Sequence, residues 1–589
     1  MTPIEELSWV GMLAGRCNND AFAQQPDASS HYQHLQLAAN AVKKLQLDQR
    51  VDSRLHHLAV LGPTQSGKSS LVNVLLDTKA ASASPLAGFT VHSQGYADQI
   101  DTVDIAYVGS LMAPLQRTGA TELDSSNLAS YVFEKVTAGS ASLVAKTAVW
   151  DTPDFDSISA SGYEHSVIKT LALADIVVLV ASKDKYGDKR VWDMLELINA
   201  LKKPLLVFIN KTDDKDEMTV TQAFSTRYMA RFSTPLPHLI CLPFIKNAGA
   251  RLPISEQDQQ RIQAGIERLS LDVDSSHYRS DVEQFIEEYE DQWLEPLAQQ
   301  ADAQDKWTQW IREALDEAET YYAINYLENP DKYDTFNRAL MTLLGLLEIP
   351  GIAPAMARAR TVITWPARQL LGLGRGAVRS ATNSNKAGTD DPAEQESLVH
   401  EHMLHMILTR LQGQLLQAPA TSWWQSVDRA FRSEVPTINQ NYANASKLAR
   451  VQFEPEIDKA ANLLHEQLKT QPALLNTLRA ARASADAAGV ALAVKTGGLS
   501  PTDLIVAPVM LSLTTMLTES ALGQYLTSVK NELKQRQKKH IRQRLLQDVL
   551  EHGLIDLVKR MPATHIVMDN LEPELQARLD AYQSRRSTD

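Results

Sequence analysis

The chain is poor in cysteine and glycine, and it has no long hydrophobic run. Its 589 residues include 2 cysteines and 25 glycines, which excludes disulfide-rich secreted proteins and collagen-like proteins. The longest uncharged apolar stretch spans only 504–518 and contains Pro508, so it is too short for an ordinary membrane-spanning helix. Near the start, Glu5 and Glu6 stand where a signal peptide would carry basic residues. We therefore expect a cytoplasmic protein.

An excess of positive charge is also absent. The 58 Lys and Arg residues are outnumbered by 71 Asp and Glu residues, and the net charge is −13. Such a chain repels phosphate backbones, so nucleic acid is not an expected partner and any anionic ligand must be held by a local site. The 44% hydrophobic fraction excludes wholesale disorder. Cys17 and Cys241 are expected to be reduced thiols in a protein core.

The pattern of apolar residues divides the chain into three parts. Residues 1–55 have a loosely helical spacing. Within 56–250, helical stretches separate short apolar runs, at 58–61, 147–150, 175–181, 204–209 and 238–244. Parallel strands covered on both faces give such continuous runs, so 56–250 is predicted to be an α/β domain with a mostly parallel sheet flanked by helices. Helical spacing returns in 251–589, which predicts a large all-α region with a polar linker near 380–397.

A glycine-rich loop follows the first apolar run. Its letters, GPTQSGKS from Gly62 to Ser69, satisfy the pattern G-x-x-x-x-G-K-[ST] between a predicted strand and a predicted helix. Glycines let successive backbone N–H groups face one anion, and the helix adds its positive N-terminal end. Lys68 is expected to act on the β- and γ-phosphates and Ser69 to bind Mg²⁺. The residues expected to contact the nucleotide here are Gly62, Thr64, Gln65, Ser66, Gly67, Lys68, Ser69 and Ser70.

Two further motifs end later strands. Asp151 ends the run 146–150, where its carboxylate could reach the Mg²⁺ shell, and Asn210-Lys211-Thr212-Asp213 ends the run 204–209. The carboxyl ends of parallel strands meet at one edge of a sheet, which is where ligands gather. The three motifs together predict a nucleoside triphosphate site at that edge.

With these motifs, residues 62–250 resemble P-loop GTPases of the translation-factor-related class, nearest to Era-like GTPases. The resemblance implies a GTPase domain over 56–250 with GTP or GDP and Mg²⁺ as ligands. It implies that Asp213 pairs with guanine, while Asn210 and Lys211 buttress the base and the P-loop. The fifth motif of the family is poorly marked, and we place it around 246–248.

The same resemblance implies a switch threonine that closes on Mg²⁺ and the γ-phosphate, and Thr90 is the candidate. We therefore expect Thr90, with Ser69 and Asp151, to be a metal ligand, and Thr90 with Lys68 to act in catalysis. The alternative is that Thr90 is an ordinary strand-edge threonine.

Two positions depart from the family pattern. The glycine of D-x-x-G is replaced by Asp154, which brings a side chain and a negative charge to the γ-phosphate position. The next residue, where some relatives carry a water-orienting glutamine, is Phe155. We therefore expect slow intrinsic hydrolysis of GTP, with the water positioned by a group from a second protomer or a partner.

One segment of the helical region is cationic and apolar. From 349 to 389 there is no acidic residue, and the segment carries Trp365 together with six positive residues, Arg358, Arg360, Arg368, Arg375, Arg379 and Lys386. This composition is typical of a segment that binds an anionic membrane surface. The alternative is a core hairpin whose arginines pair with acidic helices.

The layout of a GTPase domain followed by a long helical region resembles that of bacterial dynamin-like GTPases. We expect a GTP-hydrolysing switch whose nucleotide state controls the helical region. One hypothesis places it peripherally at the inner face of a membrane, through residues 349–379. The alternatives are an assembly GTPase with an unknown protein partner or self-association, and an RNA-associated Era-like factor, which the acidic charge disfavours.

Overall fold

The computed structural model describes residues 4–587 with several gaps. The residues outside the description are 1–3, 23–24, 26–27, 51–54, 82–89, 125, 140–141, 145, 157–159, 214, 244–253, 272–274, 331, 348–391, 481–514, 516, 520–521, 562–569 and 588–589. The expected membrane segment 349–379 and the expected fifth motif around 246–248 therefore lie outside the described residues.

The chain packs into two compact units. The first comprises Met1–Asp302 together with Pro562–Asp589, and the second comprises Ala303–Met561. These units are defined by packing, and the domain borders expected at 55/56 and 250/251 stay predictions.

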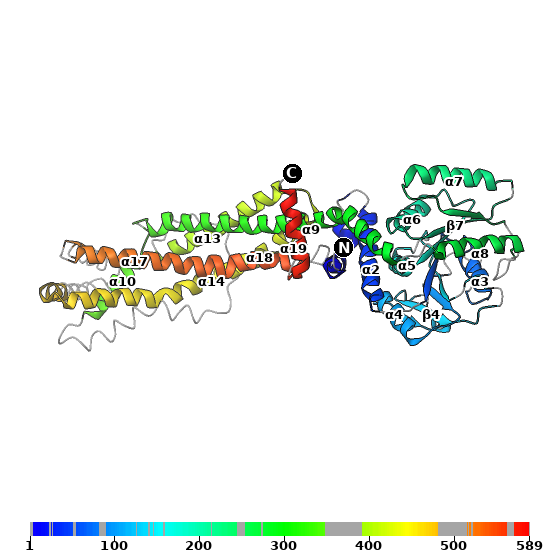
Figure 1. The fold of residues 1–589 in the computed structure, drawn as a ribbon. Coiled ribbons are helices and arrows are strands. Elements are labelled where there is room, and N and C mark those ends of the chain that lie inside the picture. Colours follow the sequence, from blue (N-terminus) through cyan, green and yellow to red (C-terminus); the bar gives the residue numbers. More distant parts are fainter. Residues whose placement is uncertain are drawn as a thin grey trace. The chain divides into compact units, whose positions relative to one another are not determined.

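The first unit contains an eight-stranded sheet (Figure 1). Its strands lie in the order β3-β4-β2-β5-β1-β6-β7-β8, and all neighbours are parallel except β2 and β5. The strands are β1 (His56–Leu61), β2 (Gln94–Ala97), β3 (Gln116–Thr118), β4 (Ser130–Lys135), β5 (Thr147–Asp151), β6 (Ile176–Ser182), β7 (Leu205–Asn210) and β8 (His238–Cys241). The predicted α/β fold with a mostly parallel sheet is confirmed.

Helices cover both faces of this sheet. They are α2 (Ala28–Asp48), α3 (Lys68–Leu76), α4 (Thr102–Met112), α5 (Ala160–Leu173), α6 (Lys189–Ala200), α7 (Glu217–Arg231) and α8 (Glu256–Leu271), and α1 (Ser8–Arg16) packs on α2. Side chains of a strand alternate between its faces. In β1, Ala59 and Leu61 join the core formed with α2, α5 and α6, while Leu58 and Val60 join the core formed with α3 and α8. Burial on both faces explains the continuous apolar runs.

Three strands, β2, β3 and β4, lie between residues 94 and 143, outside the apolar runs from which the sheet is predicted. Strands β2, β3 and β4 extend the sheet beyond β5, and helix α4 packs on them. The apolar contacts include Phe133 of β4 stacked on Trp150 of β5, with ring centroids 5.5 Å apart. This segment is therefore part of the sheet.

Helix α2 is tied to the sheet by a buried ion pair. Lys44 Nζ donates to Asp175 Oδ1 at 2.5 Å, and Asp175 Oδ2 accepts from the backbone N–H of His57 at 2.9 Å. Lys44 is only 2% exposed, so its charge needs these partners. The core around α1 and α2 also buries Cys17 and Cys241, both free thiols, and burial raises the pKa of Cys17 to about 12.

The C-terminal helix α19 (Pro573–Arg586) belongs to the same unit. Leu575 and Leu579 are buried in the core shared with α1 and α2. Arg578 and Arg585 form ion pairs with Glu290 of α9 (Ser275–Tyr322), a residue that is 6% exposed. Helix α19 therefore contributes to the same core as α1 and α2.

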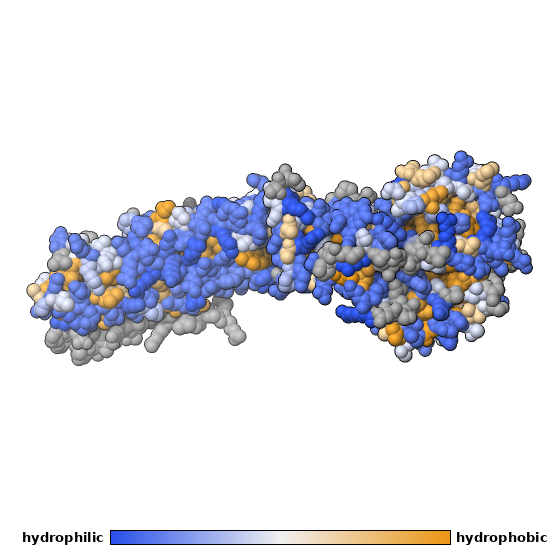
Figure 2. Space-filling model, viewed as in Figure 1, coloured by the Kyte–Doolittle hydropathy of each residue, from blue (hydrophilic) through white to orange (hydrophobic). Residues whose placement is uncertain are grey.

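The second unit is entirely helical in its described residues. It contains the later part of α9, α10 (Thr335–Leu346), α13 (Pro392–Gln417), α14 (Ser422–Lys469), α17 (Gly523–Ile541) and α18 (His552–Lys559), with π-helices at Ala323–Leu327 and Arg542–Glu551. The predicted all-α region is confirmed in that part of the chain. Its face in Figure 2 is mostly hydrophilic, because the apolar side chains form an internal core. Among the described helices, none combines the length and apolar composition needed to cross a membrane.

The polar linker expected near 380–397 extends less far than the sequence indicated. Residues 392–397 are helical and form the start of α13. Glu396 is 3% exposed and accepts hydrogen bonds from Tyr322 Oη and Gln537 Nε2, both at 2.9 Å. Glu396 is polar, but it belongs to the helical core because donors on neighbouring helices satisfy its buried carboxylate.

The packing of α19 gives a stability prediction. Replacing Leu575→Ala should lower the free energy of unfolding of the first unit by about 2–5 kcal/mol, because it removes a fully buried side chain and leaves a cavity. Urea unfolding followed by circular dichroism measures the change. Glu574→Ala, on the exposed side of the same helix, is the control. Equal midpoints for the two variants would show that α19 contributes little to the core.

Candidate nucleotide-binding site

The P-loop lies between β1 and α3, and its geometry requires both of its glycines. A Cβ on Gly62 would lie 2.2 Å from the carbonyl oxygen of Val180. Gly67 has φ +100°, and a Cβ there would lie 2.4 Å from Asn210 Nδ2. Gln65 also adopts a left-handed conformation, with φ +59°. The loop is thus tightly curled and packs against β6 and Asn210, a path that side chains at positions 62 and 67 would block.

The motif at the end of β7 contacts this loop directly. Asn210 Nδ2 donates to the carbonyl oxygen of Ser66 at 2.9 Å, and Lys211 Nζ donates to the carbonyl oxygen of Gln65 at 2.9 Å. Asn210 Oδ1 accepts from the backbone N–H of Lys211 at 2.8 Å, which fixes the amide orientation. Asp213, two residues further on, is exposed. Strand β6 separates β7 from β1, so these side chains join two motifs that the sheet alone would leave apart.

At the end of β5, Asp151 meets the first turn of α3. Ser69 Oγ donates to Asp151 Oδ2 at 2.6 Å, and Ser70 follows in the same turn. Asp151 is fully buried, and its Oδ1 has no hydrogen-bond partner, nor does the buried Oγ of Ser66. Burial raises the pKa of Asp151 to about 6, against the opposing effects of Lys68 and of the Ser69 hydrogen bond. A buried carboxylate oxygen without a donor is suited to a metal ion.

Asp154, the residue that replaces the family's glycine, contacts the P-loop lysine. Its Oδ1 forms an ion pair with Lys68 Nζ, which also donates to the carbonyl oxygen of Pro63 at 3.2 Å. Lys68 is 5% exposed and Asp154 is 6% exposed. The side chain that the sequence marked as a departure therefore lies on the ammonium expected to bind phosphate.

Sequence reasoning missed two residues at this site. Asp156 Oδ1 accepts from the backbone N–H of Thr64 at 2.5 Å and from its Oγ1 at 2.6 Å. Lys185, just after β6, donates to Asp156 Oδ2 at 2.6 Å and to the carbonyl oxygen of Thr64 at 3.2 Å. Burial acts to raise the pKa of Asp156, but the hydrogen bonds from Lys185 and Thr64 outweigh it and the pKa is lowered. The signal for Lys185 was its place after a strand that ends at the same sheet edge.

The position of Thr90 does not decide its role. Thr90 is 8% exposed and follows the undescribed segment 82–89. Among the contacts of the described residues, none joins Thr90 to Ser69 or Asp151. The switch function of Thr90 stays a prediction.

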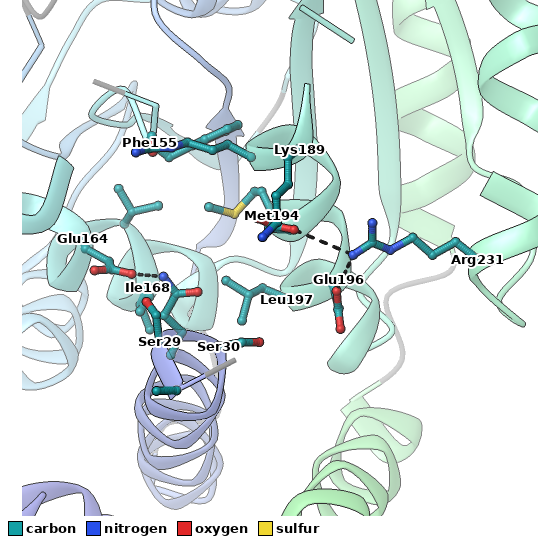
Figure 3. A pocket seen from close by; sticks show the side chains of 15 residues that line it. Ser29, Ser30, Phe155, Glu164, Ile168, Lys189, Met194, Glu196, Leu197 and Arg231 are labelled. Carbon is teal, nitrogen blue, oxygen red and sulfur yellow. Dashed lines mark hydrogen bonds and ion pairs between the residues drawn. The ribbon is translucent and has the colours of Figure 1, made fainter. Parts of the chain in front are cut away.

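A cavity of about 790 Å³ lies beside this site, and the residue that follows Asp154 is one of those that line it (Figure 3). Phe155 lines the cavity together with side chains of α2, α5 and α6, and Arg231 of α7 pairs with Glu196 at its rim at 2.7 Å. The backbone carbonyl of Phe155 accepts from Arg190 Nη1 at 3.3 Å. No P-loop residue lines the cavity, so it is distinct from the phosphate site.

Comparison with known proteins agrees with this geometry. Residues 57–211 match the family described as 50S ribosome-binding GTPase. Over these residues the chain is similar to P-loop GTPase domains. The matched range runs from β1 through Lys211 and includes the phosphate loop, Asp151 and Asn210, so the predicted GTPase fold is confirmed over that range.

Two solved chains are similar over nearly the whole length. Both come from an oligomerised bacterial dynamin pair, described as providing a mechanism for the long-range sensing and tethering of membranes. The first covers 96% of each chain at 14% identity with a TM-score of 0.37. The second covers 93% of this chain and 91% of that chain at 14% identity, with a TM-score of 0.36. No curated protein matches the chain.

The close approach of Gly67 to Asn210 leads to a testable prediction. Replacing Gly67→Ala should weaken binding of a fluorescent GDP analogue by about a hundredfold or more, because the added Cβ forces Asn210 or the loop out of place. Fluorescence titration measures the dissociation constant. Gly11→Ala, on α1 with nothing within 4 Å of the added Cβ, is the control. Unchanged affinity in Gly67→Ala would show that the loop does not hold the nucleotide in this conformation.

Proposed function

We propose that this protein binds guanine nucleotides and hydrolyses GTP, and that the nucleotide state controls its helical region. The observation that carries the proposal is the contact between two motifs: Asn210 and Lys211 donate to the carbonyls of Ser66 and Gln65. A loop suited to phosphate and a motif suited to a base are thereby held in one site. A family match over the same residues supports the proposal.

Each part of the nucleotide has a candidate partner. The backbone from Gly62 to Ser70 would cradle the phosphates, with Lys68 as their point charge. The carboxylate of Asp213 would accept hydrogen bonds from guanine, while Lys211 and Asn210 hold the base loop against the P-loop.

Mg²⁺ has a fitting donor set in Ser69 and Asp151. Mg²⁺ commonly takes one or two protein ligands and completes its shell with phosphate oxygens and water. The described residues hold no cluster of three or more His, Cys, Asp or Glu side chains able to bind a metal. When bound, the ion would neutralise charge on the phosphates. Thr90 is proposed as a further ligand contributed by the switch segment.

Hydrolysis by the isolated chain is proposed to be slow. Phe155 stands where a glutamine would orient the attacking water, and its ring has no hydrogen-bonding atom. It lines the cavity beside the site instead. Lys68 and Thr90 remain the proposed catalytic residues, and a second protomer or a partner would supply the group that positions water.

The guanine assignment has a direct test. Asp213→Asn should weaken GDP binding by about a hundredfold and favour xanthosine diphosphate, because the amide no longer accepts both donors of guanine. Calorimetric titration with the two diphosphates measures the switch. Asp184→Asn, an exposed aspartate after β6, is the control. If the Asp213 variant still prefers guanine, the base lies elsewhere.

We also propose that the protein contacts an anionic membrane surface through the segment 349–379, which has no acidic residue. Its arginines would attract an anionic surface, each contributing about 1 kcal/mol, and its apolar residues would supply depth of insertion. In a chain with net charge −13, this local excess of positive charge is unexpected for a simple core segment. The competing proposal is that the helical region binds a protein partner or a second copy of the chain.

Liposome flotation separates these alternatives. The wild type should float with anionic vesicles and not with neutral ones, and a variant carrying Glu in place of Arg358, Arg360 and Arg368 should lose this binding. Raising the salt concentration should weaken the wild-type interaction, because salt screens surface charges. If the wild type does not bind anionic lipid with GDP, with a GTP analogue or without nucleotide, the membrane proposal is wrong and the protein-partner proposal replaces it.

A further inference from the structure

The ammonium group of Lys68 already has an anionic partner within the chain. Asp154 Oδ1 forms an ion pair with Lys68 Nζ, and the carbonyl oxygen of Pro63 accepts a further hydrogen bond from it at 3.2 Å. Both residues are buried, so water screens their attraction little. The Asp154 carboxylate therefore already pairs with the ammonium group to which a γ-phosphate would bind.

We propose that Asp154 sets the nucleotide preference of this site, favouring GDP over GTP. The inference rests on the proposed binding of guanine nucleotides at the P-loop. Lys68 is expected to act on both the β- and the γ-phosphate, so GTP adds a γ-phosphate that competes with Asp154, whereas GDP brings only its β-phosphate and leaves the ion pair closer to its present state.

The charges around the site support this preference. Three carboxylates, Asp151, Asp154 and Asp156, face the P-loop, against the ammonium groups of Lys68 and Lys185. Lys185 is held by Asp156 and Lys211 donates to the carbonyl oxygen of Gln65, so Lys68, which is paired with Asp154, is the cation within the P-loop itself. A γ-phosphate then meets the Asp154 carboxylate in a poorly screened setting, where like charges repel strongly.

A glycine at position 154 would remove this competition. It keeps the backbone N–H and has no side chain to reach Lys68. Two residues further on, Asp156 accepts two hydrogen bonds from Thr64, which ties the segment that carries Asp154 to the P-loop. Asp154 is thus a specificity-determining residue, distinct from the groups that hold the nucleotide.

The test is the ratio of two dissociation constants. Calorimetry with Mg²⁺ present would measure GDP and a non-hydrolysable GTP analogue on the full chain, for the wild type, Asp154→Asn and Asp154→Gly. Both variants should improve analogue binding relative to GDP by about tenfold or more, since the competing charge is lost. Asp124→Asn removes an exposed carboxylate on the β3–β4 connection and should leave the ratio unchanged.

The outcomes separate this inference from the function on which it rests. No binding of GDP to the wild type overturns the proposed function. GDP binding with the same ratio in wild type and Asp154 variants overturns the role of Asp154. The wild type alone also tests it: an analogue that binds tenfold more tightly than GDP would contradict the inference even if neither variant folds, as judged by circular dichroism.

Discussion

The parallel pairing of β5, β1, β6 and β7 is the constraint on which the rest of the first unit depends. Because these strands run in the same direction, their carboxyl ends lie at one edge. That edge carries Asp151, the P-loop, Lys185 and Asn210. Reversing any one of these strands would send its functional residues to the opposite edge. The apolar runs that bury the strands on both faces therefore also assemble the site.

Much of this arrangement could be predicted from the sequence. The strands β1, β5, β6, β7 and β8 are continuous apolar runs, and the P-loop has a fixed pattern with a physical reason for each glycine. Strands β2 and β3 are short and lie near an edge of the sheet, so their sequences carry no strong periodicity. The place of α19 depends on contacts with residues more than 280 positions earlier, such as Arg578 with Glu290, which no local pattern reveals.

The side-chain chemistry of the site was less predictable than its location. The sequence marked Asp154 as a departure but could not show that its carboxylate would lie on Lys68. Asp156 belongs to no motif, yet it receives two hydrogen bonds from Thr64. Partners of this kind follow from the three-dimensional path of the segment after β5. Buried charges elsewhere, such as Lys44 with Asp175, likewise become understandable only when both partners are placed.

The burial of both native thiols has a practical consequence. Cys17 and Cys241 are 8% and 5% exposed, and burial raises the pKa of each, so the reactive thiolate is scarce at neutral pH. A cysteine introduced at an open position, such as Met218 on α7, which is 80% exposed, would be modified far faster than either. A single fluorophore or spin label could therefore be attached to the first unit with little reaction at the two native cysteines.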